Sequence, residues 1–86
     1  MLPESPSKVR RIITKFHQDG DDRQGEIDVT HIPFEELRRS FEVNPNDPLM
    51  YDCYRLNAVQ VAALQPYLGE QLHLDRYDYY LEAEGE

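Results

Sequence analysis

Cysteine, basic side chains and long apolar runs are all scarce in this chain of 86 residues. Its single cysteine, Cys53, cannot form an internal disulfide, so the fold must rest on its hydrophobic core. No apolar run approaches the roughly 18 to 20 residues that a membrane span needs, and the chain does not start with a basic segment followed by a hydrophobic one. We therefore expect a cytoplasmic protein that does not bind membranes.

The residue sets that enzymes use for catalysis are absent as well. The sequence contains no glycine-rich phosphate loop and no nucleophile elbow, and no local histidine motif could activate the thiol of Cys53. Acidic neighbours such as Glu35 and Glu36 are adjacent on one helix surface and do not converge. We therefore expect no catalytic residues and no enzymatic activity.

Candidate metal ligands are present but wrongly spaced. The three histidines are far apart, at His17, His31 and His73. None of them has a zinc-site spacing with Cys53. The acidic loop 19–26 fails the EF-hand pattern, because Arg23 falls at its fifth position and Gln24 replaces its required glycine. We interpret this loop as a solvated turn and expect neither a metal ion nor a cofactor.

The length of the chain indicates one small domain. A domain of this size buries only about 60 to 65% of its unfolded surface, which leaves little room for an internal cavity. No repeat and no Gly/Ser-rich linker indicates a second domain. We expect a disordered start over residues 1–7, a single domain over 8–83 and an acidic tail over 84–86.

Acidic side chains outnumber basic ones, and they do so unevenly. The formal net charge is -8; residues 1–39 carry seven basic and eight acidic side chains, whereas residues 40–86 carry two and nine. Such a field repels phosphate backbones and attracts cationic proteins, which argues against direct nucleic-acid binding. The alternative is that the charge only keeps a small domain in solution.

The first part of the chain predicts two antiparallel strands. Residues 8–17 are rich in β-branched and aromatic side chains, and Ile12 and Phe16 keep a period of two. A polar, glycine-containing loop leads to a second strand over 26–29. The basic side chains of the first strand would line an edge of the sheet: Arg10, Arg11 and Lys15. Because such an edge can pair with a second copy, we expect a monomer or a weak dimer.

Two helices are predicted by their spacing and end signals. The first follows Pro33 and would bury one face made of Phe34, Leu37 and Phe41. The second spans residues 58–64, with Asn57 as its N-cap and Gln60 three residues further on. Strands are expected before and after this second helix, over 50–56 and 75–83. We expect the rings of three tyrosines to pack in the core: Tyr67, Tyr77 and Tyr79.

Together these elements predict an α+β fold. We expect a four-stranded antiparallel sheet with two short helices, in the order β-β-α-β-α-β, with one sheet face covered and the other available for binding. Alternation turns one set inward: Ile27, Val29, Tyr54, Leu56, Tyr79 and Leu81. It turns a second set outward: Glu26, Asp28, Cys53, Arg55, Asp78, Tyr80 and Glu82.

The outward set has the side chains of a protein interface, with Tyr80 as an aromatic anchor inside an acidic rim. The alternative is an ordinary solvated sheet face. From position 40 to position 82 the chain also carries a spaced pattern of residues: Ser40, Val43, Asp47, Cys53, Ala58, Val61, Leu64, Gln65, Pro66, Tyr67, Gln71 and Tyr79. This pattern covers about half of the chain, and through it the chain resembles the cloacin-type bacteriocin immunity proteins.

The resemblance implies a small antiparallel sheet that binds the ribonuclease domain of a bacteriocin through one sheet face, with the position of Cys53 on that face. Arg55 replaces an acidic residue of the family pattern, and Asn57 and Gln60 replace apolar or aromatic ones. We expect an immunity protein that binds and neutralises a cognate basic nuclease toxin, a ribonuclease in the first place, in a one-to-one complex through the outward set. The alternative is an acidic adaptor or regulatory protein whose basic partner is unrelated to toxins.

Overall fold

The computed structural model describes residues 9–20 and 22–85, so the predicted start of the chain, with Lys8 and Glu86, lies outside the described residues. The described elements, in chain order, are β1 (Val9–His17), β2 (Arg23–Asp28), α1 (Phe34–Ser40), β3 (Tyr54–Arg55), α2 (Ala58–Leu64), the short 3-10 helix η1 (Gln65–Tyr67) and β4 (Tyr77–Gly85). The predicted α+β fold and its β-β-α-β-α-β order are confirmed.

The four strands form one antiparallel sheet in the order β2-β1-β4-β3. β1 therefore lies inside the sheet, with β4 paired along its whole length from Val9 opposite Gly85 to His17 opposite Tyr77. The prediction that the basic residues of the first strand line an edge of the sheet is therefore wrong. A second copy of the chain cannot pair with this strand, because β2 and β4 already flank it. Arg10, Arg11 and Lys15 all belong to a strand whose two edges are occupied.

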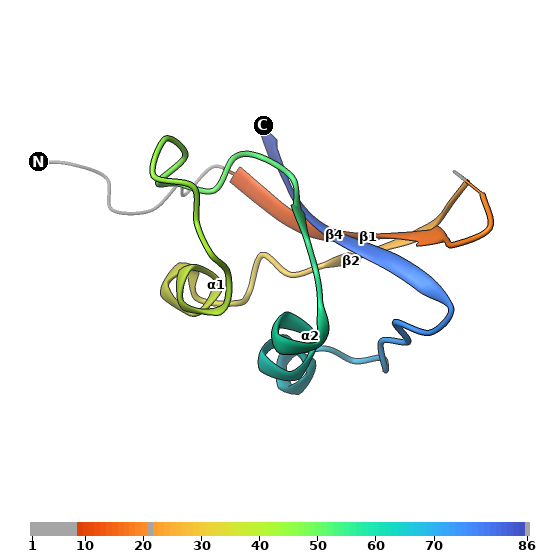
Figure 1. Cartoon of the computed structure of the whole chain (residues 1–86). Coiled ribbons are helices and arrows are strands. Elements are labelled where there is room, and N and C mark those ends of the chain that lie inside the picture. Colours follow the sequence, from red (N-terminus) through yellow and green to blue (C-terminus); the bar gives the residue numbers. More distant parts are fainter. Residues whose placement is uncertain (1–8, 21, 86) are drawn as a thin grey trace, which may run out of the picture.

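Both helices lie against the same face of the sheet (Figure 1), where the core forms. Every member of the predicted inward set is buried in this core or packs against it. Leu37 of α1 is buried, and Phe34 and Phe41 pack beside it as the helical spacing predicts. Tyr79 is fully buried, and Tyr67 and Tyr77 pack against the core, so the prediction for these tyrosines is confirmed.

The second helix begins and ends at the residues that its signals predict. The Asn57 side chain accepts hydrogen bonds from the backbone N–H groups of Val59 and Gln60, and the Gln60 side chain accepts one from the Asn57 N–H. This reciprocal cap satisfies donors that the first turn leaves unpaired. Pro66 then falls in η1, which ends the helical segment. None of the helices in the described ranges has the length and apolar character that crossing a membrane would require.

The strand expected over residues 50–56 is much shorter, because the loop before it is held in another conformation. The Asp47 carboxylate accepts hydrogen bonds from the backbone N–H groups of Tyr51 and Asp52, at 2.8 and 3.0 Å, and from the Tyr54 hydroxyl at 2.7 Å. Burial opposes the charged form of Asp47, but these hydrogen bonds outweigh it, so its pKa lies below the ordinary value. Met50 has a positive φ of 56°, which interrupts any extended run.

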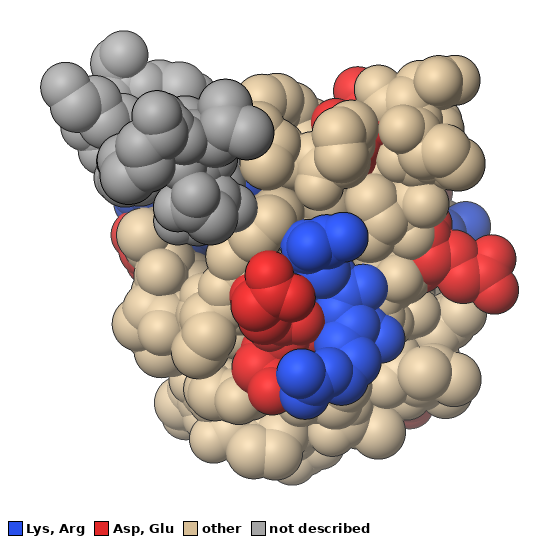
Figure 2. Space-filling model, turned by 90° about the vertical axis from the view of Figure 1, so that its left-hand side faces the viewer, with Lys and Arg blue, Asp and Glu red and all other residues tan. Residues whose placement is uncertain are grey.

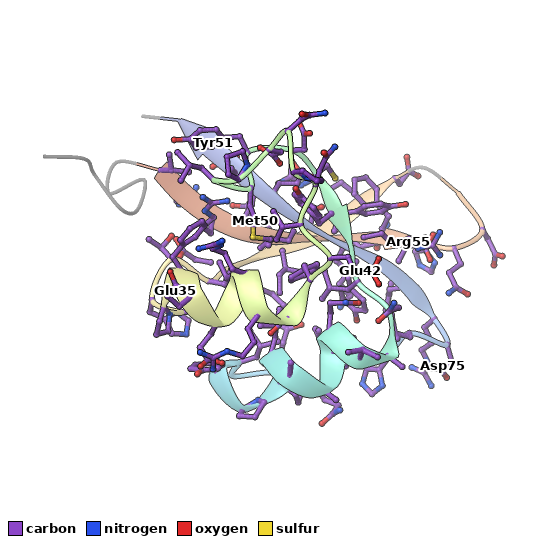
Figure 3. The ribbon with its side chains drawn as sticks, turned by 60° about the vertical axis from the view of Figure 1, so that its left-hand side comes forward. Glu35, Glu42, Met50, Tyr51, Arg55 and Asp75 are labelled. Carbon is purple, nitrogen blue, oxygen red and sulfur yellow. The ribbon has the colours of Figure 1, made fainter. Side chains whose placement is uncertain are left out.

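Arg11 holds the same loop from inside the sheet. Its guanidinium group donates to the backbone carbonyls of Leu49 and Met50, and the residue is only 4% exposed. Burial lowers the pKa of Arg11. The two carbonyl oxygens and the Phe34 ring, whose centroid lies 5.3 Å from the guanidinium carbon, stabilise its positive charge. Met50 lies between the sheet and α1, whereas Tyr51 points to the outside (Figure 3).

The remaining strand bounds differ by a few residues from the predicted ones. β2 runs over Arg23–Asp28 and so begins earlier than expected, inside the loop that we interpreted as a turn. β4 runs over Tyr77–Gly85, past the predicted end of the last strand. Its extension has a physical reason, because Glu84 pairs with Arg10 on the neighbouring strand and the ladder continues to Gly85.

Candidate functional site

The sheet has a second face, turned away from α1 and α2, which we call the open face (Figure 1). Residues that lie opposite each other on neighbouring strands point to the same side. Thr14 of β1 lies opposite Glu26 of β2 and Tyr80 of β4, and Tyr80 lies opposite Arg55 of β3. By the period of two, one side of the sheet therefore carries six members of the predicted outward set: Glu26, Asp28, Arg55, Asp78, Tyr80 and Glu82.

Cys53, the seventh member, stands just before β3, is exposed, and borders the same face beside Tyr80 and Glu82. The structure thus brings the whole predicted outward set together on one face. It also places further residues there that sequence reasoning did not select, among them Arg10, Phe16 and Glu84. Arg10 and Phe16 have the same parity as Ile12, so the period of two in the first strand contained the signal.

The centre of the open face is closely packed although none of the described helices covers it. Ile12 and Thr14 have no exposed surface, and both belong to β1, the strand with neighbours on both sides. The Thr14 hydroxyl donates a hydrogen bond of 2.7 Å to Glu82 Oε2. The β1 side chains thus divide the open face into two parts with different chemistry.

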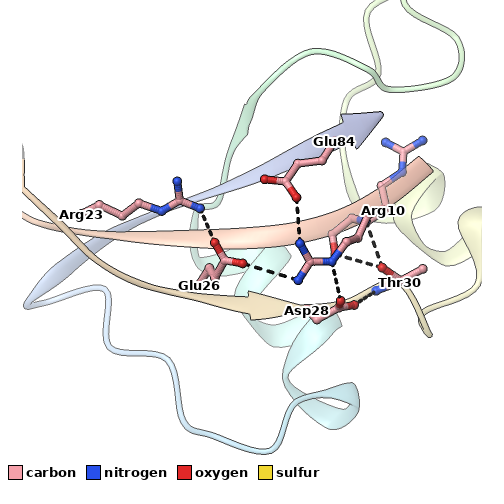
Figure 4. A network of polar contacts seen from close by, with 7 residues as sticks. Arg10, Arg23, Glu26, Asp28, Thr30 and Glu84 are labelled. Atoms are coloured by element: carbon pink, nitrogen blue, oxygen red, sulfur yellow. Dashed lines mark hydrogen bonds and ion pairs between the residues drawn. The ribbon is translucent and has the colours of Figure 1, made fainter. Parts of the chain in front are cut away.

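The first part is a cluster of ion pairs from β1, β2 and the end of β4 that we call the ion-pair half: Arg10, Arg23, Glu26, Asp28 and Glu84 (Figure 4). The Arg10 guanidinium lies 3.0 Å from Asp28 Oδ2, 2.8 Å from Glu84 Oε1 and 3.5 Å from Glu26 Oε2. Arg23 lies 2.6 Å from the other oxygen of Glu26. The three carboxylates of this half are therefore all paired with two arginines of the chain itself.

Asp28 shows how strongly one carboxylate of this half favours its charged form. Hydrogen bonds from the Thr30 backbone and side chain, and then from Arg10, lower its pKa from 3.8 to about 2. Its Oδ1 accepts the Thr30 N–H at 2.8 Å. In return, the hydrogen bond and the charge of Asp28 raise the pKa of Arg10. Both charges therefore persist over the whole physiological pH range.

The second part, bordered by the end of β1, by β4 and by the residue before β3, is an open depression of about 310 Å³ that we call the hollow. It is lined by Phe16, His17, Gly20, Cys53, Asp78, Tyr80 and Glu82. The rings of Phe16 and Tyr80 meet edge to face, with centroids 5.8 Å apart. Asp78 accepts from Arg55 at 3.1 Å, so Arg55 is held by a carboxylate at the border. The hollow therefore combines an aromatic wall with carboxylates.

Cys53 is not prepared for nucleophilic chemistry. Partial desolvation, and then the negative charges of Glu82 and Asp52, raise the pKa of its thiol above the ordinary value. The thiolate is the reactive form, and these surroundings disfavour it. Across residues 9–20 and 22–85, no three His, Cys, Asp or Glu side chains come together in a way that could hold a metal ion.

Among the described residues, the helical side of the molecule carries charges of both signs. On α1, Glu35 pairs with Arg38 at 3.5 Å and Glu36 with Arg39 at 2.9 Å. Figure 2 shows acidic and basic side chains next to each other on this side. Because the charges alternate, α1 offers no broad field to a charged partner.

Several residues of the cloacin-type pattern serve the fold. The Gln65 side chain donates to the Glu70 carbonyl at 2.7 Å and accepts the Leu72 N–H at 3.1 Å, which ties η1 to the segment before β4. The buried Tyr79 hydroxyl accepts the His73 N–H at 3.0 Å. Cys53 differs from these residues because it is exposed at the border of the hollow.

Comparison with known proteins gives a family without an assigned activity. No curated protein matches the chain. The model of a family described as a domain of unknown function (DUF7683) matches residues 10–82, which include β2, β3, both helices, nearly all of β1 and the first two thirds of β4. That description contains no link to bacteriocin immunity, so the resemblance to immunity proteins stays a prediction. The chain belongs to the DUF7683 family.

Proposed function

We propose that this protein binds a cognate basic nuclease toxin through the open face and neutralises it in a one-to-one complex. The observation that carries the proposal is the convergence of the predicted outward set on a sheet face that no helix covers. An aromatic anchor in the middle of such a face, surrounded by carboxylates, has the composition of a protein interface.

Inhibition would come from occlusion and charge. A nuclease engages phosphate groups through a cationic surface, and a protein with a net charge of -8 is attracted to such a surface before contact. Electrostatic attraction raises the association rate, and desolvated aromatic contacts lower the dissociation rate. The bound face would then exclude the nucleic acid without any chemical step, in keeping with the expected absence of a catalytic site.

The resemblance to cloacin-type immunity proteins favours a ribonuclease as the toxin and the cytoplasm as the place of inhibition. Two of the departures from that pattern, Asn57 and Gln60, form the N-terminal cap of α2 and so have a structural reason. The third, Arg55, lies on the open face itself, paired with Asp78. A changed charge on the binding face suits a different toxin, because specificity can depend on a few repulsive or unpaired groups.

The second candidate function is an acidic adaptor for a basic protein unrelated to toxins. The observation that favours it is the ion-pair half, where Arg10 and Arg23 neutralise much of the negative charge. A partner of moderate positive charge would suit such a face better than a strongly basic nuclease. This adaptor would not rescue a cell from a nuclease.

The test is survival of cells that express the C-terminal domain of a neighbouring toxin-like gene, with and without this protein, together with inspection of cellular RNA. We expect survival and intact RNA only when both proteins are made. A second measurement uses Cys53, the single cysteine, as a probe: alkylation by iodoacetamide, followed by intact mass, should be slowed in the complex. Cell death despite soluble expression of both proteins would contradict the proposal and favour the adaptor.

A further inference from the structure

The carboxylates of the open face differ in one respect, namely whether an arginine of the chain already neutralises them. An arginine nitrogen lies within 3.5 Å of every other carboxylate of this face: Glu26, Asp28, Asp78 and Glu84. Among the described residues, Glu82 has no such pair. Glu82 is thus the carboxylate of the face that remains for an external cation.

The local geometry fixes how Glu82 presents its charge. Its Oε2 accepts the hydrogen bond from Thr14, a fully buried residue of the central strand. Its Oε1 accepts no hydrogen bond from the residues that the structure describes. One oxygen is therefore anchored, and the other is available at the border of the hollow.

The remaining walls suit a flat cation. Phe16 and Tyr80 both line the hollow, and an aromatic ring face attracts a cation. Arg55 does not compete for this place, because Asp78 holds its guanidinium at 3.1 Å. The raised pKa of Cys53 keeps that wall uncharged.

The volume limits what can enter. At about 310 Å³ the hollow is at the lower end of the range for small-molecule sites, which runs from about 300 to 1,000 Å³, and it is open to solvent. It has room for the end of one long side chain. A planar guanidinium can pair with a carboxylate and stack on an aromatic ring at once, whereas an ammonium group acts as a point charge.

We propose that the hollow receives one arginine side chain of the partner, with its guanidinium paired to Glu82 and stacked on Tyr80. This proposal rests on the proposed function for the identity of the partner, but not for the chemistry of the site. The hollow then acts as the specific contact of the open face, and the ion-pair half acts as its border.

The test is an NMR titration of the ¹⁵N-labelled protein with N-acetyl-L-arginine amide, with the uncharged citrulline analogue as ligand control. We expect saturable shifts of the amide signals of Cys53, Tyr80 and Glu82 with the arginine ligand only. The lysine analogue should bind more weakly. Glu82→Gln should lower the affinity for the arginine ligand by about fivefold, as expected for loss of one exposed charge pair.

Two further variants control this result. Glu35→Gln makes the same charge change on α1, far from Arg55 (Figure 3), and should leave the titration unchanged. Tyr80→Leu keeps the carboxylate and removes the stacking ring, and it should also weaken binding. The proposal is overturned if the arginine and citrulline ligands shift the same signals equally, or if Glu82→Gln binds arginine as the unchanged protein does.

The inference and the proposed function can fail separately. If the protein neutralises a nuclease while the arginine ligand leaves the hollow unchanged, the function stands and the inference is wrong. If the arginine ligand binds as expected while no nuclease is inhibited, the hollow remains an arginine site and the toxin proposal is wrong.

Discussion

The two faces of the sheet are held by different forces. Ile13 and Ile12 are neighbours on the central strand and both are fully buried, yet only Ile13 belongs to the hydrophobic core under the helices. On the covered face, apolar side chains from both helices and from β4 pack together. On the open face, the neighbouring strands are joined by ion pairs and by the Thr14–Glu82 hydrogen bond.

This difference separates stability from recognition. Burying apolar surface stabilises a fold by about 25 cal/mol per Å², whereas an exposed ion pair contributes about 0 to 1 kcal/mol. The covered face therefore holds most of the folding free energy. Residues of the open face can change with the partner at little cost to the fold, which suits a protein whose partner must be matched closely in charge.

The largest expected effect comes from substitution of two neighbours on β4, one on each face. Leu81 is 1% exposed, and Leu81→Ala should lower the free energy of unfolding by about 3 kcal/mol, because it removes buried methyl groups and leaves a cavity. Tyr80→Ala, on the open face, should cost less stability and should instead weaken partner binding. The free energy of unfolding in urea and the affinity for the partner, both measured on the two variants, test this prediction.

The proposed division between a stabilising face and a binding face would be wrong if Tyr80→Ala lowered the free energy of unfolding as much as Leu81→Ala. It would also break if Leu81→Ala, at a temperature where it stays folded, bound the partner as weakly as Tyr80→Ala. Leu81→Met is a matched control, because it keeps the volume and should cost less than about 1.5 kcal/mol.

The next effect compares the two parts of the open face. Asp78→Lys combined with Glu82→Lys in the hollow should weaken toxin binding by at least about tenfold. Glu26→Lys combined with Glu84→Lys makes the same charge change in the ion-pair half. Both variants should slow association, but only the hollow variant should also speed dissociation, because it alone disrupts the desolvated part of the interface. Binding kinetics at low and high salt separate the two effects, and equal dissociation rates would remove the hollow as the specific contact.

Local patterns in the sequence predicted a large part of this architecture. Alternation in the last strand assigned Tyr79 and Leu81 to the core, and the Asn57–Gln60 cap predicted where α2 begins. Such signals lie within a few residues of each other, so a single sequence contains them. The open face could be assembled from the same alternation.

The errors concern pairings between distant segments. No local pattern indicates that β4 pairs with β1, which put the first strand inside the sheet and not at its edge. The strand expected before α2 was too long, because Arg11, 39 residues from Met50 in sequence, holds the loop by its carbonyls. The acidity of the face was overstated for the same reason, since Arg10 meets Asp28 and Glu84 only in the folded sheet.

The smallest expected effect is the acid response of the ion-pair half. The pKa of Asp28 is about 2 in the folded protein and about 3.8 in the absence of its partners, so folding favours its charged form. A carboxyl group with a lowered pKa contributes stability that is fully present above pH 3.8 and is lost as the pH falls towards 2. Asp28→Asn should therefore flatten the dependence of unfolding free energy on pH in that window.

The effect should be modest, because Asp28 is exposed and solvent screens its interactions with Arg10 and Thr30. NMR titration of the Asp28 carboxyl carbon gives the folded pKa directly, and Thr30→Val should raise it by removing the hydroxyl partner that helps to lower it. If the Asp28 carboxyl titrated near 3.8 in the unchanged protein, its contacts with Thr30 and Arg10 (Figure 4) would not persist in solution. Asp28 would then be as available to a partner as Glu82, and the contrast between the ion-pair half and the hollow would be weaker.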